Sequence, residues 1–190
     1  YAFALLAALL IAGSISDHLG RRPVIFGALV LEIIAMALFS IASGPEWLIA
    51  ARIVQGLATG IAGASLGAAL VDVDRAKGQI VNSIAPLCGM AVGAVGTSAL
   101  IQYGPFPMHL IYALLLLAFA LLAAAIWLTQ ETGGTRPGAL GSLIPRVTVP
   151  QQVKRPLSLV TPINIANWTL AGFYLSLVPS LVASTTGSRA

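Results

Sequence analysis

The sequence predicts an all-α fold, a polytopic bundle of membrane-spanning helices. Of its 190 residues, 58% are hydrophobic and 8% are charged, and the mean hydropathy is +0.94. An average soluble domain carries about 25% charged residues. The apolar residues form continuous runs rather than alternating patterns, which favours helices over the strands of a membrane barrel. These two observations indicate an integral membrane protein.

Six apolar runs follow one another along the chain. They cover residues 1–16, 24–43, 47–71, 79–102, 108–128 and 161–182. A spanning helix needs about 20 residues, so all but the first are long enough. The first run has its positive charges after it rather than before it, which is not the pattern of a signal peptide. We therefore expect six membrane helices in a fragment of a larger protein.

The distribution of Lys and Arg predicts the orientation of these helices. The links 17–23, 72–78 and 129–160 carry eight basic residues, whereas the alternate links, 44–46 and 103–107, carry none. Basic residues concentrate in cytoplasmic loops, so we place the first set of links in the cytoplasm. The link 129–160 is also the longest and is rich in Gly and Pro, which predicts a linker between two bundles.

The stretch from Gly13 to Pro23 carries the most specific motif. Its key residues are Gly13, Asp17, Gly20, Arg21 and Arg22. The glycines suit a tight turn, and we expect Asp17 to cap a helix start. This spacing resembles the loop between the second and third helices of Major Facilitator Superfamily transporters, from which His18 is the one departure.

The resemblance implies a twelve-helix transporter of two bundles, of which this chain holds the second to seventh helices. Residues 1–128 would belong to the N-terminal bundle, 129–160 to the cytoplasmic linker and 161–190 to the first helix of the C-terminal bundle. In that family an acid at the position of Asp72 meets the arginine of the opening motif. We therefore expect Asp17, Arg21 and Asp72 to form a cytoplasmic gate latch, although a solvated charged loop explains them equally well.

Arg52 lies about 9 Å into the third run, which is deep for a cation in lipid. Gln55 and Thr59 follow at i+3 and i+7, so the three residues share one helix face. The segment from Arg52 to Gly56 resembles the fourth-helix motif of the family, whose arginine faces the central cavity and is linked to proton coupling. The alternative is a face that only packs against another helix through hydrogen bonds.

Glu32 lies near the middle of its run, with Ala28 and Ala35 on the same face. Small residues on that face predict contact with protein rather than lipid. A carboxyl group placed there would suit proton binding and release. The alternative, which we favour at this point, is a neutral carboxyl group hydrogen-bonded between helices.

Two further patterns are candidates for packing and for substrate contact. Gly89, Gly93 and Gly96 predict close helix packing and partly resemble a fifth-helix motif of antiporters, in which Ala94 replaces the usual proline. Asn164, Asn167 and Tyr174 form a polar strip that would line a substrate path. An interfacial belt with hydrogen bonds between helices explains that strip equally well.

No enzyme signature is present, because the sequence has no nucleophile elbow, no phosphate-binding glycine loop and no paired metal ligands. We expect no cofactor, no metal and no nucleic-acid partner. The resemblance implies secondary active transport of a small molecule by alternating access, coupled to protons, in the lipid bilayer of a bacterial inner membrane. Efflux of drugs or metabolites is favoured over uptake of a nutrient or organic acid. A receptor or scaffold that transports nothing is the alternative of another class.

Overall fold

A computed structural model describes residues 1–134 and 151–186. The chain divides into two units, 1–146 and 147–190, and each is treated by itself. The helices are α1 (Ala2–Leu19), α2 (Arg21–Ser40), α3 (Pro45–Val73), α4 (Arg75–Tyr103), α5 (Pro107–Leu128) and α6 (Gln151–Thr186). The predicted all-α fold is confirmed for the described residues, and α1 to α5 are each long and apolar enough to cross a membrane.

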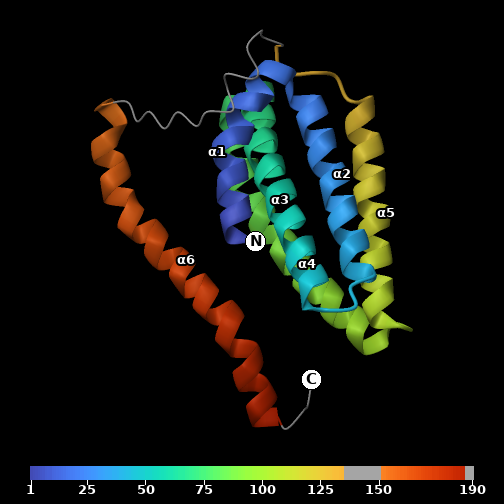
Figure 1. Ribbon diagram of the computed structural model, residues 1–190. Coiled ribbons are helices and arrows are strands. Elements are labelled where there is room, and N and C mark those ends of the chain that lie inside the picture. The colour runs from blue at the N-terminus through green and yellow to red at the C-terminus, as the bar shows by residue number, and fades with distance from the viewer. Residues whose placement is uncertain (135–150, 187–190) are drawn as a thin grey trace. The chain divides into compact units, whose positions relative to one another are not determined.

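The first unit is a bundle of five helices with α3 at its centre. α3 packs against α1, α2 and α4, and α5 packs against α2 (Figure 1). Successive helices run in opposite directions, so the α1–α2 link, the α3–α4 link and the end of α5 lie at one end of the bundle (Figure 1). These are the links that carry basic residues, and we name this end the cytoplasmic end.

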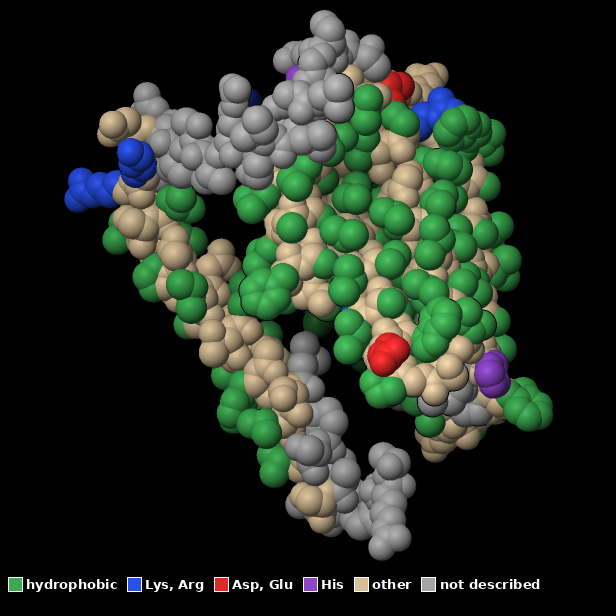
Figure 2. Space-filling view, in the orientation of Figure 1, with side chains coloured by type: hydrophobic (Ala, Val, Ile, Leu, Met, Phe, Trp, Pro, Cys, Tyr) green, Lys and Arg blue, Asp and Glu red, His purple; other side chains and the backbone are tan. Residues whose placement is uncertain are grey.

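The core of this bundle is made of small residues. The largest side chains that are fully buried are Ser16 and Ser65, while most of the large aliphatic and aromatic side chains are exposed. Figure 2 shows hydrophobic side chains spread over the visible side of the bundle, with charged side chains toward its ends. A soluble protein would bury its large apolar residues, whereas lipid can solvate them and small residues let helices pack closely. The burial pattern therefore agrees with a multi-pass membrane protein.

The helices α1 and α3 pack closely at two glycines of α3. A Cβ atom added to Gly60 would lie 2.6 Å from the Ala8 Cβ, and one added to Gly56 would lie 3.0 Å from the Ala4 Cβ. Both distances are shorter than an ordinary carbon–carbon contact of about 3.5–4.0 Å. The two glycines therefore bring the helix backbones together.

The two links at the cytoplasmic end are shorter than the apolar runs indicated. Gly20 alone separates α1 from α2, and Asp74 alone separates α3 from α4. Asp17 consequently lies in the last turn of α1, and the expectation that it caps a helix start is wrong. Hydropathy ends a run at the first charged residue, but backbone hydrogen bonding continues the helix into the headgroup region.

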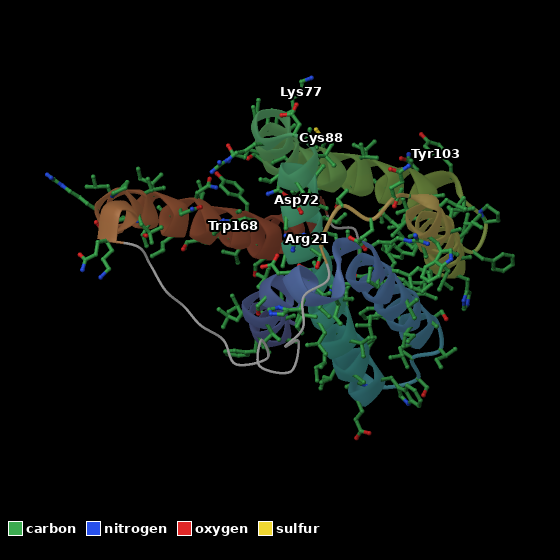
Figure 3. The ribbon with its side chains drawn as sticks, turned by 90° about the horizontal axis from the view of Figure 1, so that it is seen from above. Arg21, Asp72, Lys77, Cys88, Tyr103 and Trp168 are labelled. Carbon is green, nitrogen blue, oxygen red and sulfur yellow. The ribbon has the colours of Figure 1, made fainter. Side chains whose placement is uncertain are left out.

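The stripe of Gly89, Gly93 and Gly96 lies on α4, which inclines behind α3 from Lys77 to Tyr103 (Figures 1 and 3). No heavy atom of the described residues lies within 4 Å of a Cβ placed on any of these three glycines. Gly78 is the buried residue of α4 instead. Close packing along the stripe stays a prediction.

In the second unit, α6 begins at Gln151, ten residues before the apolar run at 161. Residues 151–160 of the predicted linker 129–160 are therefore helical, and the division between the two units, after residue 146, lies within that linker. Gln151, Gln152, Lys154 and Arg155 are good helix formers, which a hydropathy boundary cannot reveal. Residues 135–150 of the linker lie outside the described part of the chain.

Candidate functional site

Arg21 is the centre of a charged cluster at the cytoplasmic end. Its guanidinium group bonds the Asp17 Oδ1 at 2.6 Å from Nη1 and the Asp72 Oδ2 at 2.9 Å from Nε. The side chain of Arg21 is only 12% exposed, against 51% for Asp17 and 35% for Asp72. Seen from above, Arg21 and Asp72 lie together although they come from α2 and α3 (Figure 3). The structure thus brings the three predicted residues together; their role as a latch stays a prediction.

Ser16 is a member of this cluster that the sequence analysis missed. Its Oγ accepts a hydrogen bond from Arg21 Nη1 at 2.6 Å and donates one to the Gly13 carbonyl at 2.9 Å. Ser16 is fully buried, so it supports the guanidinium group from the protein side. In the sequence, only its position next to Asp17 indicated that Ser16 could belong to the cluster. Gly13, by contrast, has no heavy atom within 4 Å of a Cβ placed on it.

Glu131 is the second missed residue, and it lies just after α5. Its carboxylate accepts hydrogen bonds from the backbone N–H of Arg21 at 2.7 Å, of Arg22 at 3.1 Å and of Gly133 at 2.9 Å. The contact joins residues more than a hundred positions apart, so no local sequence signal announces it. It ties the start of the long linker to the start of α2.

Arg22 is directed toward α5 rather than into the cluster. Its guanidinium carbon lies 4.7 Å from the ring centroid of Trp127, which is a cation–π distance. The same ring lies 5.0 Å from that of Phe26. Arg22 thus fixes the cytoplasmic ends of α2 and α5 to one another, and it does not contribute to the Asp17 and Asp72 pairs.

A second polar group lies inside the bundle, where α2 and α3 pack. The Thr59 hydroxyl donates a 2.8 Å hydrogen bond to Glu32 Oε1, and Glu32 is only 8% exposed. Burying a carboxyl group is costly unless it is hydrogen-bonded, so the Thr59 hydroxyl stabilises it there. Glu32 therefore has a polar partner between two helices, as the favoured structural alternative expects.

Arg52 lies two turns before Thr59 on the same face of α3. Its Nη1 donates to Gln55 Oε1 at 3.0 Å, and its guanidinium carbon lies 5.2 Å from the ring centroid of Phe39 in α2. Phe39 in turn stacks on Tyr112 of α5, with centroids 6.0 Å apart. The polar face of α3 is thus directed at α2 in the described residues, with Arg52 itself exposed. That arrangement brings Arg52, Gln55, Thr59 and Glu32 onto one interface.

The predicted polar strip lies on α6. Asn164, Asn167 and Tyr174 are all exposed, and the Tyr174 ring lies edge-on to Phe173 with centroids 6.2 Å apart. Asn164 also lines a shallow groove on this helix together with Thr161 and Trp168. The described residues of this unit supply no partner helix, so the substrate path stays a prediction.

The chemistry available here is that of charge pairing and proton exchange. Within the described ranges, no three His, Cys, Asp or Glu residues lie close enough to hold a metal ion. The cluster at Arg21 is a set of ion pairs, and the Glu32 side chain is a carboxyl group, which as a chemical group can bind a proton. The Arg21 cluster and the Glu32–Thr59 pair share the helices α2 and α3, which run from one end of the bundle to the other.

Comparison with known proteins gives the family of the chain. The model of the Major Facilitator Superfamily matches residues 1–188. Multidrug resistance protein MdtL of Escherichia coli (strain K12) is 30% identical over 145 residues, which are 73% of this chain and 36% of that protein. MdtL of Shigella boydii serotype 18 (strain CDC 3083-94 / BS512) matches with the same identity and coverage.

The chain thus spans little more than a third of the length of these relatives. The family match, by contrast, extends over almost all of its residues and agrees with the helical bundle, the small-residue core and the Arg21 cluster. On this evidence, the chain belongs to the Major Facilitator Superfamily.

Proposed function

We propose that this chain forms part of a secondary transporter that moves a small molecule across the membrane by alternating access between two bundles. The observation that carries the proposal is the Arg21 cluster, in which one partly buried arginine joins the end of α1, the start of α2 and the end of α3. Ion pairs of this kind bias a two-state equilibrium without locking it.

The transported molecule is a drug or metabolite, and the direction is export from the cytoplasm. The support for this choice is the name of the relatives, which are multidrug resistance proteins. Their bacterial origin also supports placement in a bacterial inner membrane.

Transport is coupled to protons, with Glu32 as the residue that binds and releases them. Its burial and its hydrogen bond from Thr59 support this role, because protonation would remove the unfavourable charge between α2 and α3. Arg52 lies two turns from Thr59 on the same face of α3. A change in the charge of Glu32 therefore alters the electrostatic field at the Arg52 guanidinium group.

The test is a flux assay on the full-length protein in proteoliposomes, with ethidium as the probe and an imposed pH gradient. We expect ethidium movement that stops when a protonophore collapses the gradient. Glu32→Gln should make the residual flux insensitive to pH, and Arg52→Ala should reduce it. Glu46→Gln, at the exposed start of α3, is the matched control and should behave as the parent.

Gradient-independent ethidium flux through the folded protein would contradict proton coupling. The absence of flux for ethidium and for anionic and neutral probes alike would favour a receptor or scaffold. Ethidium movement from the outer to the cytoplasmic side of the protein would show that the direction of transport is uptake, not export.

A further inference from the structure

Glu131 completes the hydrogen bonding at the start of α2. The first N–H groups of a helix have no partner within the helix. Here the Gly20 N–H donates to the Ser16 carbonyl at 3.2 Å, and the N–H groups of Arg21 and Arg22 donate to the Glu131 carboxylate. The next residue is Pro23, which has no N–H. With Glu131 in place, the N–H groups of Gly20, Arg21 and Arg22 therefore each have a partner.

Gly20 makes room for that carboxylate. Its φ of +97° is strained for residues with a side chain. A Cβ at this position would also lie 2.7 Å from Glu131 Oε2 and 2.9 Å from its Cδ. Gly20 has no side chain to cap α2, and the negative charge at this helix start comes from Glu131 instead.

Arg21 links Glu131 to the cluster. Its backbone N–H bonds Glu131, and its side chain bonds the other members of the cluster. Arg21 is the first residue of α2, and its N–H donates to Glu131 while its guanidinium group bonds Asp17 and Asp72. A shift of the Arg21 backbone moves the guanidinium group relative to Asp72, which belongs to another helix. The position of Glu131 thus sets whether the pair across α2 and α3 can form.

We propose that Glu131 is a positioning residue of the Arg21 cluster, and that through it the start of the interbundle linker controls whether the cytoplasmic end closes. The inference rests on the proposed function, since it treats the cluster as an element that opens and closes. When the linker draws Glu131 away, the start of α2 loses two acceptors and Arg21 is released from Asp72. When Glu131 returns, the cluster forms again.

Ser16 supplies a reporter for this motion, because it is fully buried beneath the Arg21 guanidinium group. The experiment uses full-length protein in inside-out vesicles, with Ser16→Cys as its single cysteine and Cys88 replaced by Ser. The rate of alkylation by a membrane-impermeant maleimide is measured. Arg21→Ala should raise this rate because it removes the covering side chain.

We expect Glu131→Ala to raise the alkylation rate about fivefold, the population change that corresponds to the loss of a helix cap. Glu131→Gln keeps one carbonyl acceptor without the charge, so its rate should be intermediate; it replaces Glu131→Ala if that variant lowers the yield of folded protein. Glu46→Ala, an acid removed from the other end of the bundle, is the control and should leave the rate unchanged.

The outcomes separate the two proposals. If Arg21→Ala raises the rate and both Glu131 variants leave it at the parental value, the positioning role is overturned and the cluster survives. If Arg21→Ala leaves the rate unchanged as well, the cluster does not cover this end and both proposals fail.

A second pair of variants tests the steric argument. Gly20→Ala should expel the Glu131 carboxylate by itself, so adding Glu131→Ala to it should change the rate little further. Independent, multiplicative effects of the two substitutions would contradict the proposed contact.

Discussion

The close approach of α1 and α3 gives a stability prediction that can be worked from distances. Gly60→Ala adds one methyl group at a point where the Ala8 Cβ would lie 2.6 Å away and the Leu5 carbonyl oxygen also 2.6 Å away. An ordinary carbon–carbon contact requires about 3.5–4.0 Å, so α1 must withdraw by roughly 1 Å.

That withdrawal weakens the dispersion contacts along the helix pair, because a gap of 0.5–1 Å forfeits about a quarter to a half of each contact. Overpacking of this kind costs about 1–3 kcal/mol. Alanine is a better helix former than glycine by about 1 kcal/mol, which offsets part of the cost. We expect a net loss of about 1 kcal/mol in the free energy of unfolding.

Gly63→Ala is the matched control on the same helix. A Cβ at Gly63 would meet only the Leu9 Cδ2, at 4.0 Å, so the substitution keeps the gain in helix propensity without a clash. The measurement is the unfolding midpoint of the full-length protein in detergent, with both variants compared with the parent. A Gly60→Ala midpoint equal to or above that of Gly63→Ala would refute the packing argument.

Three further predictions concern the charged and polar contacts. A double-mutant cycle on Arg21 and Asp72, read from the unfolding midpoint, should show coupling above the 0.2–1 kcal/mol of exposed pairs, because Arg21 is only 12% exposed; additive effects would contradict it. Thr59→Val should cost about 1–3 kcal/mol, since it leaves the Glu32 carboxyl group buried without its donor, and Glu32→Leu in that background should restore the midpoint. Arg52→Lys should retain part of the transport activity that Arg52→Ala loses; equal loss would show that charge alone is insufficient.

Much of the fold could be predicted because a membrane places strong demands on sequence. Every spanning segment needs a long apolar run, and the basic residues must stay on one side. The helices and their alternation follow from those demands, whereas the family resemblance rests on the motif at Gly13 to Arg22. The start of α6 could not be predicted in the same way, because Gln151 to Arg155 are helical but polar and a hydropathy boundary excludes them.

The candidate site was predictable only where its members lie close in sequence or match a motif. Asp17 and Arg21 are four residues apart on either side of Gly20 and belong to the motif, and Arg52 and Gln55 are three residues apart on one helix, so closeness in sequence joins each pair. Periodicity also placed Thr59 on the face of Arg52. It could not show that this face meets α2, where Thr59 bonds Glu32 and Arg52 lies over Phe39.

The sequence by itself therefore determined that this is a multi-pass helical protein and which family it resembles, and it predicts which end of the helices is cytoplasmic. Only the tertiary structure decided that Ser16 lies beneath Arg21 and that Glu131 holds the start of α2. The physical reason is that unpaired backbone N–H groups donate to any nearby carboxylate, whatever its distance along the chain. Gly20 permits this contact because it has no side chain that would collide with the Glu131 carboxylate. A glycine in the sequence does not indicate which distant residue will occupy the space beside it.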